Sequence, residues 1–374
     1  MRVCIASDPY HPYPSGVTEY TYNLAKSLKE KGHSVTILTL HYPDEEREEG
    51  VERVGRVVFI PMNGTLATVP LFNPFVVKSF FTRKKFDIVH LNAPFFPNIS
   101  HWALKYSHSP CVATFHTTGF IKVNIGARYY NKIFPFYKKL KARIGVSPVA
   151  VDFIKPYIPG DYLIVPCGVD MGRFTPTGKK HPEITKVKGK KILFLGRHDT
   201  RKGLSQLLHA FNLLRRDMDV HLIVAGTGPE KSNCENFVKE HRLTEHVHFL
   251  GFIPNEDIPS VYRSCDIYCS PALGGETFGI VLIEAMASGI PVVSSNIDGY
   301  REVIKDGING LLCNPHSPED IKDKISSLLS DNTLRIRLIT EGLHTVSQYE
   351  WKRVSQRIYE IYEDVTSMTN SIGV

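Results

Sequence analysis

Two successive series of short apolar segments, each alternating with segments of helical period, constrain the fold of this chain most strongly. Parallel strands need crossover helices between them, so the alternation predicts parallel sheets covered by helices. A stretch rich in Pro, Gly and Lys, residues 175–190, separates the two series and is expected to link two domains. The expected strands are residues 3–7, 34–40, 56–62, 87–92, 111–116, 144–148 and 161–167 before this stretch, and 191–196, 220–226, 246–252, 266–271, 291–296 and 310–314 after it.

The domain boundaries follow from this alternation. We predict a first doubly wound domain at residues 1–170 and a second at 171–353, with a last helix at about 354–374 that crosses back to the first domain. Ligands of such sheets bind outside the carboxyl ends of the strands. Two such domains therefore predict an α/β protein with a central cleft that contains the binding site.

Composition limits the classes of partner. The 374 residues have a formal net charge of +7, which favours anionic partners, and no nucleic-acid-binding motif accompanies the charge. We therefore expect no nucleic-acid partner, and the sequence leaves the question of protein partners open. Seven cysteines lie mostly in apolar runs without the two-residue spacing of a zinc knuckle, which predicts buried thiols in the cytoplasm.

Any membrane contact is expected to be peripheral. The chain enters its first strand directly after Met1-Arg2, so we expect no cleavable leader. No apolar stretch approaches the roughly 20 residues that a spanning helix needs. These features predict a cytoplasmic protein that contacts the inner face of a membrane at most from its surface.

The strongest chemical motif is GGETFGIVLIEAMASGIPVVSS, residues 274–295. Its glycines present Glu276, and a helix is expected to open at Gly279. Backbone N–H groups near Phe278, Gly279 and Ile280 would form a helix N-terminus, which suits a diphosphate. The motif therefore predicts a phosphate site at the start of this helix.

Two carboxylates accompany this helix. Glu276 precedes it and Glu284 lies more than one turn inside it. One carboxylate can then bond the hydroxyls of a sugar while the other bonds a ribose diol, both through charge-assisted hydrogen bonds. The alternative is that Glu276 only complements the helix dipole and that Glu284 is a solvated helix residue.

A basic loop follows the first strand of the second series, in LFLGRHDTRKGLSQLLHAF, residues 193–211. Arg197 and Lys202 should lie at the carboxyl end of that strand, where phosphates bind. Their charge would be in place when the bond to a leaving diphosphate breaks. The alternative is an exposed basic turn.

Two features of the first series resemble binding loops. Ser15-Gly16 follows the first strand and opens a helix, so the backbone at Gly16 can approach a phosphate or an acceptor closely, although an ordinary strand-to-helix connection explains it as well. His116 ends the strand in CVATFHTTG and could bond a sugar in the cleft. A purely structural histidine is the alternative.

Apolar and basic residues share the short helix expected in NPFVVKSFFTRKKF, residues 73–86. This combination suits the surface of an anionic membrane. The alternative is a surface helix that packs its phenylalanines on the first sheet. The predicted membrane contacts are Phe75, Lys78, Phe81, Arg83, Lys84 and Lys85.

Together, these motifs resemble the family-4 retaining glycosyltransferases with the GT-B fold. The resemblance rests on SGVTEY, TFHT, GRHDTRKG and GETFGIVLIEAMASGIPVV, which are spread over nearly the whole chain. Within that family, the chain most resembles the phosphatidylinositol alpha-mannosyltransferases, which use GDP-mannose. The resemblance implies two Rossmann-like domains facing a central cleft, the first binding the acceptor and the second binding the nucleotide sugar.

The resemblance also implies a role for most of the candidate residues. It assigns His116 to the donor sugar and to catalysis, Arg197 and Lys202 to the diphosphate, Glu276 to the hexose hydroxyls and Glu284 to the ribose. Backbone amides at Gly16 would lie close to the phosphates. The membrane helix of the family falls on residues 75–86, and the predicted acceptor contacts are Tyr10, Thr18 and Thr117.

The implied reaction is retaining transfer of a hexose, mannose from GDP-mannose, to a membrane lipid such as phosphatidylinositol. No convincing aspartate pair of the metal-binding type follows a strand, so we expect neither a metal ion nor another cofactor. Ser15-Gly16 stands where these enzymes usually carry two glycines, and Thr18 stands where the inositol-lipid enzymes carry Gln.

These departures leave two alternatives open. One is glucosyl or N-acetylglucosaminyl transfer from a UDP-sugar to diacylglycerol, another lipid or a soluble acceptor. The other is a non-catalytic subunit that binds a sugar nucleotide. The presence of the full set Glu276, Arg197, Lys202 and His116 argues against the non-catalytic alternative.

Overall fold

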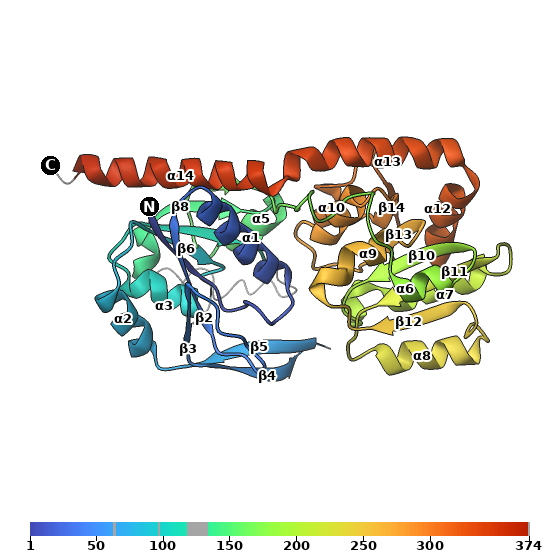
Figure 1. The fold of residues 1–374 in the computed structure, drawn as a ribbon, viewed down its shortest axis with the longest axis horizontal. Helices are drawn as coiled ribbons and strands as arrows, with labels where there is room; N and C mark the ends of the chain where they lie inside the picture. Colours follow the sequence, from blue (N-terminus) through green and yellow to red (C-terminus); the bar gives the residue numbers. More distant parts are fainter. Residues whose placement is uncertain (63–64, 96–97, 118–133, 373–374) are drawn as a thin grey trace. The chain divides into compact units, whose positions relative to one another are not determined.

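The computed structural model describes residues 1–62, 65–95, 98–117 and 134–372, and the chain divides into two compact units (Figure 1). Unit 1 contains Met1–Ile60, Leu66–Gly168 and Trp351–Val374, and unit 2 contains Pro61–Thr65 and Val169–Glu350. The chain thus leaves unit 1 after Gly168 and returns to it at Trp351. Both points lie close to the predicted boundaries.

A seven-stranded parallel sheet forms the centre of unit 1, in the order β3-β2-β1-β6-β7-β8-β9. Strand order runs outward in both directions from the neighbours β1 and β6. The winding therefore reverses between these two strands, which is where doubly wound sheets bind ligands. The strands are β1 (Arg2–Ala6), β2 (Ser34–Leu40), β3 (Val51–Val54), β6 (Ile88–Asn92), β7 (Cys111–Phe115), β8 (Leu140–Gly145) and β9 (Leu163–Ile164).

Two strand predictions in the first half need correction. The expected strand 56–62 does not join the parallel sheet, because Gly55, with a φ of +60°, turns the chain directly after β3. Instead β4 (Arg56–Met62) pairs with β5 (Thr65–Leu71) in a two-stranded sheet. The expected strand 144–148 ends earlier, because the Ser147 side chain caps a helix that begins with Pro148.

Helices cover the sheet of unit 1 and join its strands. They are α1 (Gly16–Glu30), α2 (Pro74–Arg83), α3 (Ile99–Tyr106), the 3₁₀ turn η1 (Pro135–Lys139), α5 (Pro148–Ile154) and α14 (Trp351–Ile372). The last of these belongs to unit 1, although it follows unit 2 in the chain. It packs along α1, and its Tyr359 ring stacks at 5.0 Å on that of His33, which lies between α1 and β2. The Tyr362 hydroxyl is 2.7 Å from Nδ1 of His90 on β6.

Unit 2 has a six-stranded parallel sheet in the order β12-β11-β10-β13-β14-β15. Its winding reverses between β10 and β13. The strands are β10 (Lys190–Leu195), β11 (Val220–Ala225), β12 (Val247–Gly251), β13 (Ile267–Ser270), β14 (Val292–Ser295) and β15 (Leu311–Cys313). All six were predicted from the sequence, as was the parallel doubly wound class of the sheet.

The helices of unit 2 pack on this sheet, and α7 and α12 contribute buried leucines and isoleucines to one core cluster. They are α6 (Pro182–Lys186), η2 (Thr200–Lys202), α7 (Leu204–Leu214), α8 (Lys231–Glu240), η3 (Asn255–Asp257), α9 (Ile258–Tyr262), α10 (Ile280–Ala287), α11 (Asp298–Arg301), α12 (Pro318–Ser330), α13 (Asn332–Val346) and η4 (Ser347–Tyr349).

The predicted linker is part of unit 2 and contains a helix. Ile184 of α6 is fully buried, the His181 backbone N–H donates to Oγ of Ser264 at 2.7 Å, and Arg263 donates to the carbonyl of Lys179. One buried side chain and these bonds attach the segment to the loop that follows α9. The segment that was expected to link the two domains is therefore packed within unit 2.

All seven cysteines are buried as free thiols, as the sequence predicted. Burial raises the pKa of the Cys111 thiol to about 11, which keeps it protonated and unreactive at neutral pH. Within the described residues, none of the helices combines the length and the apolar character that a membrane crossing requires.

Candidate active site

An ion pair joins the two strongest motifs at the switch point of the second sheet. Lys202 follows β10 and Glu276 follows β13, the two strands between which the winding reverses. The Lys202 Nζ donates to Oε1 of Glu276 at 2.7 Å, and the two side chains are 24% and 15% exposed. The structure therefore brings these predicted residues together, and leaves part of each open to a ligand.

A buried aspartate organises the basic loop after β10. The Asp199 carboxylate is 1% exposed, and its Oδ1 accepts from the backbone N–H of Lys202 at 3.2 Å. Arg201 lies 3.3 Å from Oδ2, and Nε of Arg197 lies 3.7 Å from the same oxygen. Asp199 thus caps the turn that carries Lys202 and pairs with both arginines. The sequence analysis missed this residue, although Asp three positions before Lys202 is a helix-capping spacing.

Glycines allow the loops at the carboxyl ends of the strands to touch. A Cβ on Gly203 would lie 1.9 Å from the carbonyl oxygen of Pro271, and one on Gly299 would lie 2.0 Å from the carbonyl oxygen of Glu276. The Leu273 N–H donates to the Arg201 carbonyl at 2.7 Å. Backbone contact of this kind fixes the loops that carry Lys202 and Glu276 against each other.

Helix α10 begins at Ile280, one residue later than predicted. Gly279 is its N-cap in the left-handed region, with a φ of +92°, and a Cβ there would lie 2.9 Å from the ring of Tyr300. Phe278 is buried and its ring meets that of Tyr349 edge-on at 5.3 Å. Ile280 is half-buried. The first N–H groups of a helix have no acceptor within the helix, so this start can receive an anion.

A buried tyrosine holds the second predicted carboxylate. The Tyr262 hydroxyl donates to Oε2 of Glu284 at 3.1 Å, and the Glu284 side chain is half-buried. Burial and the nearby Glu284 raise the pKa of Tyr262 well above its usual value, so the hydroxyl keeps its proton. Glu284 is therefore held by a hydrogen bond to a buried side chain, unlike a helix residue that contacts only solvent. Tyr262 was not predicted, because no spacing relates a residue of α9 to one of α10.

In unit 1, a chain of hydrogen bonds orients His116 at the end of β7. The Thr21 hydroxyl donates to the Val17 carbonyl at 2.7 Å and so accepts from Nδ2 of Asn92 at 2.9 Å. Oδ1 of Asn92 is then left to accept from Nε2 of His116, also at 2.9 Å. This network places the proton of the neutral imidazole on Nε2.

Burial keeps His116 neutral. Desolvation lowers its pKa to about 3, and its ring meets the buried ring of Tyr20, on α1, edge-on at 4.5 Å. Asn92 was not predicted as a site residue. Its position at the end of β6, next to β7 in the sheet, could have indicated it only once the strand order was known.

The glycine turn of unit 1 starts α1 at an exposed Gly16. Ser15 caps the helix, because its Oγ accepts from the Thr18 N–H at 3.0 Å. The Thr18 hydroxyl donates to the Tyr13 carbonyl at 2.8 Å, and the Tyr10 hydroxyl donates to Glu48 at 3.1 Å.

Two of the three predicted acceptor contacts are buried, which corrects these two predictions. The Tyr10 and Thr18 side chains are fully enclosed, so neither offers surface to an acceptor in this structure. Thr117 is exposed, and its role stays a prediction.

The predicted membrane residues lie on α2 or directly after it, and they differ in exposure. Phe75 is 63% exposed, and Lys78, Arg83, Lys84 and Lys85 are exposed beside it, with Lys84 paired to Glu52. Phe81 is buried, and its ring packs edge-on against those of Phe80 and Phe86. The prediction for Phe81 was wrong, because this side chain belongs to the core of unit 1.

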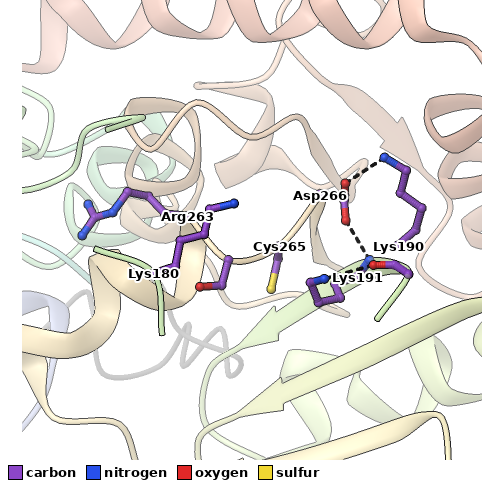
Figure 2. Close-up of a pocket in the computed structure, with 8 residues that line it drawn as sticks. Lys180, Lys190, Lys191, Arg263, Cys265 and Asp266 are labelled. Atoms are coloured by element: carbon purple, nitrogen blue, oxygen red, sulfur yellow. Dashed lines mark hydrogen bonds and ion pairs between the residues drawn. The ribbon is translucent and has the colours of Figure 1, made fainter. Parts of the chain in front are cut away.

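A cavity of about 270 Å³ lies at the opposite edge of the second sheet (Figure 2). Lys190 begins β10 and Asp266 precedes β13; the Lys190 Nζ donates to Asp266 at 3.0 Å, as Figure 2 shows. Lys180 and Arg263 also line the cavity. Because the cavity is at the amino ends of the strands, it is separate from the predicted donor site.

Comparison with known proteins assigns this chain to a family. The model of the glycosyl transferases group 1 matches residues 178–345, and that of glycosyltransferase family 4 matches residues 14–173. Full-length relatives are at least 30% identical to the chain. The chain therefore belongs to the family-4, group 1 glycosyltransferases.

Several relatives that match along nearly their full length share one name. The phosphatidyl-myo-inositol mannosyltransferase of Mycobacterium leprae is 34% identical over 100% of both chains. That of Mycolicibacterium smegmatis is 34% identical over 98% of this chain and 94% of its own length. That of Propionibacterium freudenreichii is 30% identical over 97% and 94%.

Solved structures show the same fold. A glycosyltransferase from Rickettsia africae has a TM-score of 0.78 at 23% identity, covering 97% of this chain and 98% of its own. Anabaena Alr3699/HepE, solved in complex with UDP-glucose, has a TM-score of 0.76 at 18% identity, covering 97% and 100%. These structures support the predicted GT-B class.

Proposed function

We propose that this glycosyltransferase transfers mannose from GDP-mannose to phosphatidylinositol, with retention of configuration and without a metal ion. The observation that carries the proposal is the Lys202–Glu276 ion pair at the switch point of the second sheet, beside Arg197 and the start of α10. The name shared by the full-length relatives supports the sugar and the acceptor.

The donor would be bound by unit 2 through charge. Lys202, Arg197 and the N–H groups at the start of α10 would receive the diphosphate. Glu276, whose carboxylate is already held by Lys202, would accept from the hexose hydroxyls, and Glu284 would accept from the ribose diol. Tyr262 would orient Glu284 for this bond.

The proposed chemistry is front-face substitution at the anomeric carbon. The bond from that carbon to the phosphate oxygen breaks while the acceptor hydroxyl attacks from the same face, and the proton of the hydroxyl passes to the departing phosphate. The products are GDP and the mannosylated lipid. Lys202 and Arg197 stabilise the charge that develops on the phosphate, which is the task a metal ion performs in other transferases.

Unit 1 would supply the acceptor side. His116, held neutral and with its Nε2 proton directed to Asn92, would contact the donor sugar, and Gly16 would bring backbone amides close to the phosphates. The exposed Phe75 and the cations of α2 would rest on an anionic membrane, the surface that presents a phosphatidylinositol acceptor.

The test is transfer into lipid. Purified protein is incubated with radiolabelled GDP-mannose, UDP-glucose or UDP-N-acetylglucosamine and with vesicles that contain or lack phosphatidylinositol. Label in the organic phase from GDP-mannose alone, dependent on phosphatidylinositol, is the expected result. Label from a UDP-sugar would contradict the proposal and support the UDP-sugar alternative. No turnover with any donor or acceptor would favour a non-catalytic binding subunit. A Lys202→Ala sample run in parallel separates enzymatic transfer from carry-over of label.

A further inference from the structure

Three histidines and an aspartate gather at the amino edge of the second sheet, away from the donor site. His221 is the second residue of β11, and His246 and His248 flank the first residue of β12. Side chains two residues apart on a strand share a face. The alternate residues Val220, Leu222 and Val247 point into the core, which leaves the imidazoles together on the other face.

The possible ligand atoms of this cluster lie almost as close together as the ligand atoms around a bound metal ion. Asp219, His221 and His246 each offer one ligand atom, and these atoms all lie within 4.8 Å of one another. Nδ1 of His221 is 3.1 Å from Nε2 of His248. Ligand atoms about 2.0–2.2 Å from a zinc ion lie roughly 3–4 Å apart, so small rotamer changes suffice to close the set.

The cluster already contains a positively charged side chain. The Arg215 guanidinium donates to Oδ1 of Asp219 at 3.1 Å and to Nε2 of His246 at 3.0 Å. The His246 lone pair and the Asp219 carboxylate therefore both face a cation. Asp219 is 83% exposed, so this position can be reached from solvent.

We propose that this cluster binds a divalent transition-metal ion of the zinc type, which takes the position of the Arg215 guanidinium. Asp219, His221 and His246 are the ligands, and His248 orients His221 through their hydrogen bond, as outer partners do at metal sites. Imidazole nitrogens with one carboxylate select Zn²⁺, Ni²⁺ or Co²⁺ over Mg²⁺ and Ca²⁺, which prefer oxygen.

The site is independent of the transfer reaction. It lies at the amino ends of β11 and β12, whereas Arg197 follows the carboxyl end of β10. The metal-independent chemistry proposed for transfer therefore does not conflict with a metal ion here. The ion would instead tie β11 to β12 and stabilise this edge of unit 2, because binding to the native state adds to stability.

The experiment is zinc titration of the full chain after its purification tag is removed, by calorimetry and by thermal melting. We compare wild type with His221→Gln, His246→Gln, Arg215→Gln and a control, His316→Gln, which removes an exposed imidazole elsewhere in unit 2. The melting curve without zinc verifies that each variant is folded, and Mg²⁺ serves as the oxygen-preferring control ion.

We expect one zinc ion per chain at the tightest site and a rise in melting temperature with zinc but not with Mg²⁺. His221→Gln and His246→Gln should each weaken binding at least about tenfold, since even the loss of an outer partner costs 10–100-fold. Arg215→Gln should tighten it at least about tenfold, because it removes a competing charge. His316→Gln should bind as wild type does. Equal zinc affinity in wild type, His221→Gln and His246→Gln would overturn the proposal, as would unchanged or weaker binding by a folded Arg215→Gln.

Discussion

The two parallel sheets carry different chemistry at corresponding places, the carboxyl ends of the strands beside each switch point. In unit 2 this place is charged: Lys202 is paired with Glu276, and Arg197 stands beside the buried Asp199. In unit 1 the side chains that end β6 and β7 are neutral: burial lowers the pKa of His116, whose ring is bonded to the Asn92 amide. The same kind of sheet thus carries two kinds of chemistry, because the residues at the strand ends differ.

This difference predicts which measured property should change when residues of each unit are replaced. If unit 2 binds the donor as proposed, its preplaced charge should determine how well the developing charge on a leaving diphosphate is stabilised. A neutral network at the other sheet should determine the tautomer and pKa of one imidazole. Variants of unit 2 should therefore change turnover and donor affinity, and variants of unit 1 should change pH dependence and contact with lipid.

The largest effect is expected for Lys202→Ala. Loss of one group that stabilises transition-state charge costs about 10²–10³ in turnover, or about 3–4 kcal/mol. The measurement is kcat for lipid mannosylation, with Lys180→Ala, an exposed lysine at the opposite edge of the sheet, as the control. Turnover of Lys202→Ala within a factor of two of wild type would show that the role assigned to Lys202 is wrong.

Next in size is the loss of the second carboxylate. Glu284→Gln removes a charge-assisted bond to the ribose, worth about 1.5–3 kcal/mol, and should raise KM for the donor about 10–100-fold. Tyr262→Phe removes only the group that orients Glu284 and should raise KM about two- to tenfold. The reverse order of the two variants in a donor titration would mean that Glu284 serves the fold and does not bind the donor.

A smaller effect separates the two faces of α2. Phe75→Ser removes an exposed ring from the proposed membrane face and should weaken sedimentation with anionic vesicles about tenfold, from roughly 1.5 kcal/mol of lost apolar burial. Its melting temperature should not change. Phe81→Ser is the matched control, because it should lower the melting temperature by opening the core. Unchanged vesicle binding by Phe75→Ser would remove α2 from the membrane contact.

The smallest effect is a change in pH profile for Asn92→Asp. A carboxylate beside Nε2 favours the imidazolium, so the pKa of His116 should rise by about 1–3 units from its value of about 3. His116 is neutral above its pKa, so activity should decline at a higher pH in the variant than in wild type as the medium is acidified. The measurement is kcat/KM between about pH 4 and 8. Superimposable profiles would indicate that the charge on His116 does not affect the reaction.

The fold of both units follows from features that one sequence carries. Alternating apolar and helical segments predicted every strand of the second sheet. Two expected strands of the first sheet could also have been corrected from the sequence, one from Gly55 and the other from Ser147-Pro148. The burial of Phe81 was also in the sequence, since Val77, Phe80 and Phe81 share one side of a helix of period 3.6.

The partnerships within the site could not be predicted in the same way. Lys202 and Glu276 were assigned separately, and the bond that joins them depends on β10 and β13 being neighbours in the sheet. Tyr262 and Asn92 were missed for the same reason, because their partners are distant in sequence. Sequence motifs indicate which residues carry chemistry, whereas strand order determines which of them meet.

The most direct test of the central claim, that side chains of unit 2 bind the donor diphosphate without a metal ion, is calorimetry of GDP binding in the presence of EDTA. Wild type should bind GDP with the same affinity in EDTA as in Mg²⁺, and the double variant Arg197→Ala, Lys202→Ala should bind at least about tenfold more weakly in both. Binding that disappears in EDTA and returns with Mg²⁺, or equal binding by the double variant, would contradict the account.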